Sequence, residues 1–366
     1  MSKGMKKTCF ILIGAILIVV LILFSIAFIG KEKGKETKVG FIMSGAYNET
    51  GWNGMHYDGV KRACDVLGAE LVVKENVKEY DGSCEAAIKE LAEEGVGMII
   101  LSSYNYSEEV KSVVKDYPGI VFYANSSEYH EANMTSYFVR MYQARYMAGI
   151  VAGMKTQTGK IGYVAAMSNN EVNRGISAFA LGVRSVNPDA EVMVSWTGDW
   201  DCEEKEKQAA EHLVKEEGVD VLTYHQNQTN VVHKAEELGV YSIGYHEAME
   251  NQSDRYLMSV VCDWETVYKE LVKSFLTGRA NEKENYWVGL EAEAVGLSSY
   301  SAEVTDEIIR EVEQAKHRIM SGKDVFSGVI YDTEGKIRCG DKEMISDEML
   351  LEQFDWFVEG VKFYEE

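Results

Sequence analysis

The residues best suited to binding chemistry are aromatic and amide side chains that recur directly after short apolar runs of the sequence. An aromatic face can stack on a flat ring, which contributes ~1–3 kcal/mol per base, and Asn, Gln or Ser can hydrogen-bond to the edge of that ring. Few residues at these positions are Lys or Arg, so no phosphate clamp is visible. The candidate ligand-binding residues are Trp52, Asn53, Tyr104, Tyr106, Asn125, Glu171, Trp200, Tyr224, His225, Tyr245 and His246.

Each candidate also has a structural interpretation, because an aromatic residue in a loop often packs between parts of a protein. Trp52 is the strongest candidate, since a Trp in a glycine-flanked loop has no obvious role in a core. For His225 and His246, ligand contact and a structural role are equally supported by their positions. The recurrence of the whole set at equivalent positions favours a ligand-binding cleft.

Motifs for catalysis and for metal binding are missing from the sequence. It contains neither G-x-G-x-x-G nor G-x-S-x-G, and its seven histidines form no H-E-x-x-H. Residues 153–160 depart from a phosphate-binding loop, with five residues between the glycines and Ile161 where Ser or Thr is required. Asp199 and Asp201 could serve acid–base chemistry, but no nucleophile accompanies them. We therefore expect no catalytic residue, no metal and no cofactor.

The elements that must position these side chains alternate between strand and helix. Apolar runs predict strands, and apolar residues at helical spacing predict helices. The predicted strands are 39–43, 70–73, 98–101, 120–123, 161–165, 191–195, 219–224, 240–243 and 257–262, and the predicted helices are 60–67, 84–91, 108–116, 172–183, 203–217, 231–238 and 265–276. Residues 302–320 predict a further helix, 326–338 a hairpin and 349–361 a closing helix.

Strict alternation of this kind indicates parallel sheets covered by helices on both faces. Two series of similar length predict an α/β protein with two doubly wound lobes. We expect the first lobe to hold residues 38–141 and about 263–286, and the second to hold 142–262 and about 287–366. Ligands of such sheets bind outside the carboxyl ends of the strands, where the candidate residues stand.

The N-terminus predicts a membrane segment. Residues 9–30 form an uncharged, strongly apolar run of 22 residues between lysines, long enough to cross a bilayer. A signal peptide cleaved after Ala27 is the alternative, but the run is longer than such peptides need. We expect a cytoplasmic stub (1–8), a transmembrane anchor or signal segment (9–30) and a linker (31–37). Either interpretation places the binding domain outside the cytoplasm, at the cell membrane.

The charge of the remaining chain restricts its partners. The net charge is −22, and the first 36 residues hold six Lys/Arg and two Asp/Glu, which leaves 31 and 57 in the rest. A body this acidic repels nucleic acid and anionic lipid, and it disfavours a highly phosphorylated ligand. The cysteines beyond the apolar run number five and lack metal spacing. Cys64 and Cys84 are predicted to be buried thiols, and the odd number argues against a full disulfide framework, although one bridge stays open.

Several motifs together resemble the basic membrane protein family of ABC-transporter solute-binding proteins, which includes purine nucleoside receptors. They are Glu49-Thr50-Gly51-Trp52-Asn53 and the segments 142–149, 161–164, 173–176, 179–188 and 239–245. The resemblance runs from Lys38 to about Val361. It implies a type I periplasmic-binding-protein fold with two lobes joined by a hinge, a purine-stacking role for Trp52 and a base-reading role for Asn53.

Two departures from the family pattern bear on the ligand. Glu49 stands where many members have Asp, and His246 follows Tyr245 where nucleoside-binding members have an Asp that holds the ribose hydroxyls. The replacement puts ribose recognition in doubt. The Gly-Trp-Asn sequence, with Trp196 and Trp200 later, looks like the branch that prefers a free purine base.

We expect an extracytoplasmic receptor that captures a purine base or nucleoside and delivers it to ABC permease and ATPase subunits. A membrane-anchored ligand sensor that uses the same clamp is the alternative. The stub of residues 1–8 is too short for a signalling domain. A nucleoside-processing enzyme ranks last, because no cluster of aspartates for a metal is visible.

Overall fold

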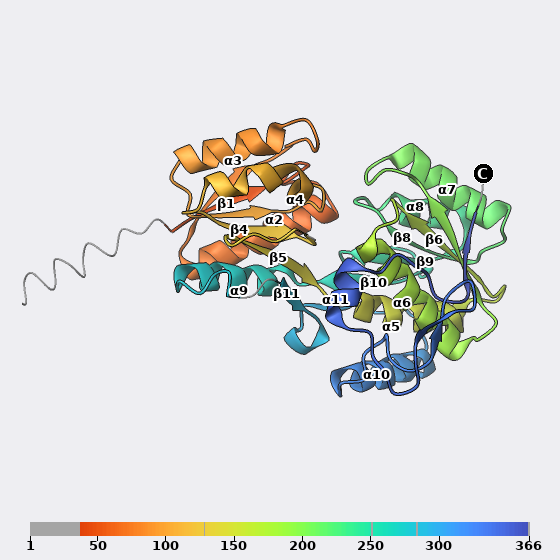
Figure 1. Cartoon of the computed structure of the whole chain (residues 1–366). Helices are drawn as coiled ribbons and strands as arrows, with labels where there is room; N and C mark the ends of the chain where they lie inside the picture. Colours follow the sequence, from red (N-terminus) through yellow and green to blue (C-terminus); the bar gives the residue numbers. More distant parts are fainter. Residues whose placement is uncertain (1–36, 128, 250–251, 283–284, 365–366) are drawn as a thin grey trace, which may run out of the picture. The chain divides into compact units, whose positions relative to one another are not determined.

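The computed structural model describes residues 37–364, except 128, 250–251 and 283–284 (Figure 1). The expected cytoplasmic stub, membrane segment and most of the linker lie outside these residues. Residues from Lys38 onward form one compact unit. In the part of the chain that the structure describes, no helix has both the length and the apolar character needed to span a bilayer.

The first sheet has the strand order β11-β5-β4-β3-β1-β2, and all its pairings are parallel. Its strands are β1 (Lys38–Ile42), β2 (Glu70–Lys74), β3 (Met98–Leu101), β4 (Val121–Asn125), β5 (Met134–Val139) and β11 (Asn285–Val288). Its helices are α2 (Trp52–Leu67), α3 (Ser83–Glu93), α4 (Tyr106–Glu109) and α9 (Trp264–Leu276), with 3₁₀ turns at Val110–Ser112 and Val114–Asp116.

Side chains alternate across this sheet and create two apolar layers. Met98 and Ile100 of β3 belong to the core that α2 and α9 complete, whereas Ile99 and Leu101 belong to the core that α3 completes. Figure 1 shows α3 on one side of the sheet and α9 on the other. Because both faces are covered, the central strands β1, β3 and β4 are largely buried and mostly apolar.

The second sheet has the order β12-β10-β9-β8-β6-β7-β15, in which only β12 is antiparallel to its neighbour. Its strands are β6 (Lys160–Ala165), β7 (Glu191–Trp196), β8 (Val221–His225), β9 (Tyr241–His246), β10 (Tyr256–Cys262), β12 (Val295–Leu297) and β15 (Val361–Phe363). The helices are α5 (Met141–Lys155), α6 (Asn170–Val186), α7 (Glu203–Lys215), α8 (Asn230–Leu238), α10 (Asp306–Met320) and α11 (Asp347–Glu352), and a small hairpin joins β13 (Ile330–Tyr331) to β14 (Ile337–Cys339).

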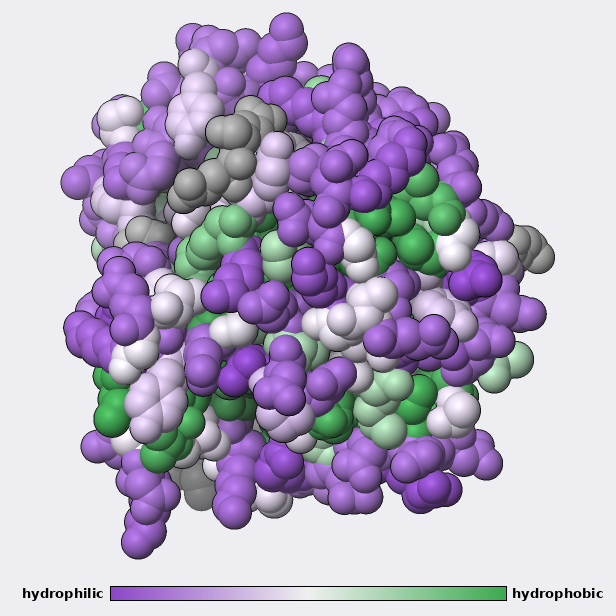
Figure 2. All heavy atoms as spheres, turned by 90° about the vertical axis from the view of Figure 1, so that its right-hand side faces the viewer, coloured by the Kyte–Doolittle hydropathy of each residue, from purple (hydrophilic) through white to green (hydrophobic). Residues whose placement is uncertain are grey.

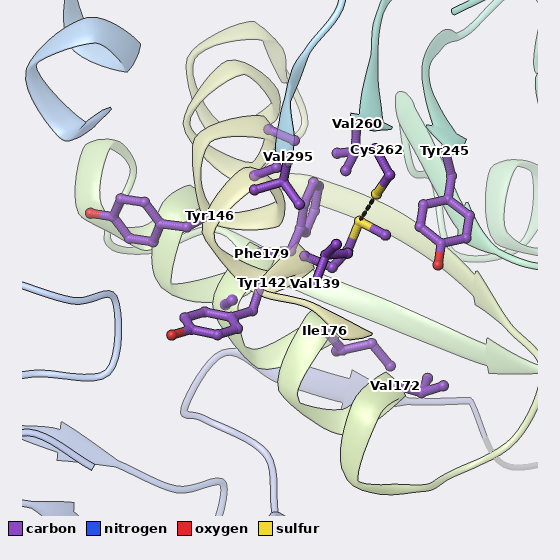
Figure 3. Packing of buried hydrophobic residues seen from close by; sticks show 14 of the residues in the cluster. Val139, Tyr142, Tyr146, Val172, Ile176, Phe179, Tyr245, Val260, Cys262 and Val295 are labelled. Carbon is purple, nitrogen blue, oxygen red and sulfur yellow. Dashed lines mark hydrogen bonds between the residues drawn. The ribbon is translucent and has the colours of Figure 1, made fainter. Parts of the chain in front are cut away.

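Helices α5 and α6 pack backbone to backbone in the core that covers the second sheet (Figure 3). A Cβ on Gly149 would stand 2.1 Å from the Phe179 carbonyl oxygen, and one on Gly182 would stand 2.0 Å from the Tyr146 carbonyl oxygen. Glycine is therefore required at both positions for this approach. Cys262 contributes its thiol beside Met141, with Sγ and Sδ 3.4 Å apart (Figure 3).

The chain passes between the two sheets after β5, β10 and β11. Hydrogen bonds tie two of these crossings together: the Arg140 amide donates to the Val288 carbonyl over 2.6 Å, and the Leu290 amide donates to Gln143 Oε1 over 3.0 Å. Through these crossings α9 and β11 return to the first sheet, although they follow β10 of the second in sequence.

The structure confirms the alternating parallel architecture and the hairpin within 326–338, and it corrects three predictions. The predicted helix 108–116 is one short helix and two 3₁₀ turns, and β5, α5, β11 and β12 were not predicted. The closing helix 349–361 is wrong, because α11 ends at Glu352 and β15 joins the second sheet. Phe354, Trp356 and Val358 are buried at a spacing of two, which is the periodicity of extended chain.

The five cysteines of the described chain are free thiols, and Cys64 and Cys84 are buried as predicted. Hydrophilic residues predominate on the face seen in Figure 2, where hydrophobic residues gather in only a few places. This distribution agrees with the acidic composition, which favours solubility.

Candidate functional site

A cavity of about 560 Å³ lies at the carboxyl ends of strands from both sheets. Its volume falls within the range of small-molecule sites in proteins. The lining residues are Ser44, Gly45, Trp52, Asn53, Val77, Lys78, Glu79, Tyr80, Ser103, Tyr104, Asn105, Asn125, Met167, Glu171, Gly198, Asp199, Trp200, Asp201, His225, Gln226, Asn227 and Tyr245.

Most of the residues singled out from the sequence meet in this cavity. Those that line it are Trp52, Asn53, Tyr104, Asn125, Glu171, Trp200, His225 and Tyr245. Sequence reasoning overlooked the loop 77–80 entirely, although it follows a predicted strand and the same strand-end rule applies to it.

Three candidates do not line the cavity. Tyr106 is buried outside the cavity, and its hydroxyl donates to the Val77 carbonyl over 2.5 Å. Tyr224 precedes His225 on β8, so alternation turns its side chain away, and its hydroxyl donates to the Tyr245 carbonyl over 3.3 Å. His246 packs among aromatic rings beside the cavity.

Trp52 is the first residue of α2, and contacts on its core side fix its indole ring. Its Nε1 donates to the Ser102 carbonyl over 3.0 Å. Its ring centroid lies 4.2 Å from that of His56 and 4.6 Å from that of His246. The expectation that Trp52 lacks a core role was therefore wrong, because it lines the cavity and also packs on the core.

The layer beneath Trp52 contains two buried, uncharged imidazoles. Burial lowers the pKa of His56 and of His246 well below the usual value. Charge repulsion from His246 lowers the pKa of His56 further, and repulsion from His225 does the same for His246. The ring of Trp264 lies 3.8 Å from that of His56 and 5.8 Å from that of His246. Neutral rings at these positions let the layer pack as an apolar floor.

Asn53 is oriented by Glu49, four residues before it in the loop that precedes α2. Asn53 Nδ2 donates to Glu49 Oε2 over 2.9 Å, and Ser44 Oγ donates to Asn53 Oδ1 over 3.4 Å. Gly45 lies against this pair so closely that a Cβ would stand 2.2 Å from Glu49 Oε2. Both amide atoms of Asn53 are thus engaged within the protein.

Buried polar side chains of the second sheet and of its helix α6 form one wall of the cavity. Glu171 Oε1 lies 3.3 Å from His225 Nε2, and the same nitrogen lies 2.9 Å from the Tyr245 hydroxyl. Burial lowers the pKa of His225 more than the neighbouring Glu171 raises it, so the imidazole is neutral. The Arg145 guanidinium lies 4.1 Å from the Tyr245 ring centroid and donates to the Tyr224 carbonyl over 2.9 Å.

Charge in the cavity is predominantly negative. Among its described lining residues four are carboxylates (Glu79, Glu171, Asp199 and Asp201) and one is a lysine, Lys78. Phosphate groups are disfavoured by such a lining, as the sequence predicts. No group of three or more potential metal ligands was found in the described chain.

The loop before α2 reaches across to loops of the second sheet. The Gly51 amide donates to Glu247 Oε1 over 3.2 Å, and the Trp52 amide donates to the Asn227 carbonyl over 3.3 Å. Gly51 has φ +76°, and a Cβ there would stand 2.0 Å from the Asn227 oxygen. The two sides of the cavity therefore touch only because this residue is glycine.

The variant Gly51→Ala is expected to separate these loops. Its methyl group overlaps the Asn227 oxygen, so the hydrogen bond from the Trp52 amide breaks. Amide hydrogen exchange at Trp52 should accelerate roughly five- to tenfold, which corresponds to the net worth of one hydrogen bond. Gly82→Ala is the matched control, because Gly82 also has positive φ but has nothing within 4 Å of its Cβ position. Unchanged protection at Trp52 in Gly51→Ala would contradict the contact.

Comparison with known proteins identifies the family. The family model Bmp, which describes PnrA-like ABC transporter substrate-binding proteins, matches residues 36–327. The chain belongs to the Bmp family. The resemblance inferred from its motifs is confirmed, and as a Bmp protein it is a solute-binding protein of the ABC-transporter class.

Two relatives and one solved structure are similar to this Bmp protein over most of its length. A "purine-binding protein" of Brucella abortus is 31% identical over 89% of this chain and 93% of that protein. A "putative ABC transporter glucose-binding protein" of Haloferax volcanii is 30% identical over 91% and 82%. A crystal structure of ABC-transporter solute-binding proteins from Aeropyrum pernix has a TM-score of 0.68 at 20% identity, covering 81% of this chain and 92% of that one. This likeness supports the periplasmic-binding-protein fold.

Proposed function

We propose that this Bmp protein captures a purine base or nucleoside in the cavity and hands it to a permease and its ATPase without changing it chemically. The carrying observation is the pairing of a fixed aromatic face, Trp52, with buried polar atoms of Asn125, Glu171 and His225 on the same cavity. A flat, uncharged heterocycle with a polar edge matches both features. The purine-binding relative supports the same ligand class.

The stacking role of Trp52 predicts a loss of affinity on truncation. Trp52→Ala should weaken adenine binding by ~1–3 kcal/mol, about 5- to 150-fold in Kd, as measured by calorimetric titration. Trp52→Phe keeps an aromatic face and should retain most of the affinity. Because Trp52 also packs on His56, thermal melting of both variants must show that they are folded. Equal affinity of Trp52→Ala and the unaltered protein would refute the stacking role.

A hexose is the second candidate ligand. The glucose-binding relative is almost as similar as the purine-binding one, and aromatic faces with carboxylates also suit sugar hydroxyls. Glucose therefore belongs in every titration panel. Tight glucose binding with no purine binding would replace the purine proposal by this one.

We further propose that residues 9–30 anchor the chain in the cell membrane with the binding domain on the extracytoplasmic side. The support is the uncharged run of 22 residues and the acidic body that follows it. Mass spectrometry of the intact protein from isolated membranes tests this: an uncleaved N-terminus is expected. A mature chain that begins after Ala27 would show cleavage instead.

A further inference from the structure

Three polar side chains on the cavity wall keep atoms that the protein itself does not satisfy. Asn125, Glu171 and His225 are 0%, 7% and 3% exposed and all line the cavity. Both amide atoms of Asn125 and the Nδ1 atom of His225 lack a hydrogen-bond partner in the described chain. Oε1 of Glu171 lies 3.3 Å from His225 Nε2 without forming a hydrogen bond. Buried polar atoms are nearly always bonded, so this grouping at one wall points to a ligand.

Other buried amides on the same cavity are already engaged. Asn53 is bonded to Glu49 and Ser44, and Asn105 donates from Nδ2 to Glu79 over 2.7 Å. The Gln226 amide is bonded to Thr197 and, in its better orientation, to backbone atoms of neighbouring residues. The unsatisfied atoms are therefore concentrated on Asn125, Glu171 and His225, which come from both sheets.

The unsatisfied atoms on this wall include more hydrogen-bond acceptors than donors. The imidazole of His225 is neutral and carries one N–H. Its Nε2 lies 2.9 Å from the Tyr245 hydroxyl and 3.3 Å from Glu171 Oε1, which only accepts. A proton on Nε2, directed at the Tyr245 oxygen, avoids setting its lone pair against Glu171 and leaves Nδ1 as an acceptor. Glu171 Oε1, His225 Nδ1 and Asn125 Oδ1 then accept, and only Asn125 Nδ2 donates. A ligand that satisfies this wall must bring more N–H donors than acceptors.

We infer that this wall selects purines with an exocyclic amine over purines with a carbonyl at the same position. This inference rests on the proposed purine-binding function and deepens it. An exocyclic amine offers two N–H donors to the acceptors of Glu171 and His225. A carbonyl oxygen there would face the Glu171 carboxylate with lone pair against lone pair and would leave the donor-seeking atoms unsatisfied. Asn125 can pair with either kind of edge by turning its amide, so it binds without discriminating.

The test is equilibrium dialysis of the full chain in detergent, after removal of co-purified ligand, against adenine, 2,6-diaminopurine, hypoxanthine, xanthine and glucose. Both amino purines should bind at least about tenfold more tightly than both oxo purines. In Glu171→Gln the amide can turn its N–H₂ toward a carbonyl, so the preference should shrink below about threefold. Glu352→Gln, an exposed change on α11, should leave the preference unaltered.

The outcomes separate the two proposals. Equal affinity of the unaltered protein for adenine and hypoxanthine overturns the selection and leaves purine binding in place. A preference that persists in a folded Glu171→Gln variant overturns the assignment to this wall. Binding of none of the purines overturns the proposed function and the selection together. If Glu171→Gln fails to fold, as thermal melting would show, the affinities of the unaltered protein still decide the selection.

Discussion

Acidification from pH 6.5 to 5.5 is expected to lower the free energy of unfolding by about 1–2 kcal/mol. His56, His225 and His246 are buried, and burial lowers the pKa of each. In the unfolded chain their pKa returns to about 6.5. Below that pH the unfolded chain binds more protons than the folded one, so stability falls as pH falls. Because the unfolded imidazole is only half protonated at pH 6.5, each histidine contributes about 1 kcal/mol over this interval while the pH stays above its folded-state pKa.

Three carboxyl groups oppose this trend, because burial raises the pKa of Glu206, Glu247 and Asp201. Burial raises the pKa of Glu206 to about 7, so between its ordinary pKa and pH 7 the folded chain binds one proton more than the unfolded chain. Over this interval the three histidines favour unfolding by about 3 kcal/mol together, Glu206 offsets about 1 kcal/mol of this, and Glu247 and Asp201 reduce it further. Urea unfolding at a series of pH values measures it.

The matched variants identify the source of the slope. His246→Gln should reduce the loss of stability between pH 6.5 and 5.5 by about 1 kcal/mol, because this side chain no longer binds a proton in the unfolded state alone. His233→Gln removes a histidine whose side chain is exposed on α8 and should leave the slope unchanged. A stability that is flat between pH 7 and 5.5 would contradict the neutral, buried state of these imidazoles.

Glu206→Gln is expected to stabilise the protein by about 3 kcal/mol at pH 8. Glu206 is fully buried on α7; its Oε2 accepts from Asn230 Nδ2 over 3.2 Å, and its Oε1 has no hydrogen-bond partner in the described chain. At pH 8 the folded state must hold this carboxylate charged against burial and against Asp201 and Asp199. A pKa raised from about 4.5 to about 7 corresponds to about 3 kcal/mol at pH values above both.

The sign of the effect depends on pH. The uncharged carboxyl form stabilises the folded state, and this contribution is fully present below about pH 4.5 and is lost as pH rises through about 7. The gain from Gln should therefore fall below about 1 kcal/mol at pH 5. Glu204→Gln on the exposed face of the same helix should change stability by less than about 0.5 kcal/mol at either pH. A destabilised Glu206→Gln at pH 8 would show that its charge is satisfied.

The sequence was most informative where one physical rule acts alone. Continuous apolar strands that alternate with amphipathic helices predict the parallel sheets, and the strand-end rule locates the cavity. The rule places a loop at the cavity but says nothing of the direction of each side chain. Tyr224 and His225 are neighbours on β8, and only the pleat decides that His225 lines the cavity.

Other features depend on contacts between distant residues. The engagement of Asn53 by Glu49 joins residues only four apart, but the edge-to-face packing of His246 of β9 on Trp52 of α2 joins different sheets. The unsatisfied state of Asn125, Glu171 and His225 likewise exists only once both sheets are in place. The spacing of two between the apolar residues Phe354, Trp356 and Val358 indicated extended chain at the C-terminus, and the predicted closing helix did not take it into account.

The most direct test of the central claim is calorimetric titration of ligand-free protein with adenine and, separately, with glucose. The proposed function predicts saturable binding of adenine at one site per chain and no heat from glucose. Binding of glucose without adenine would mean that the aromatic and carboxylate lining holds a sugar, and the purine assignment would be wrong.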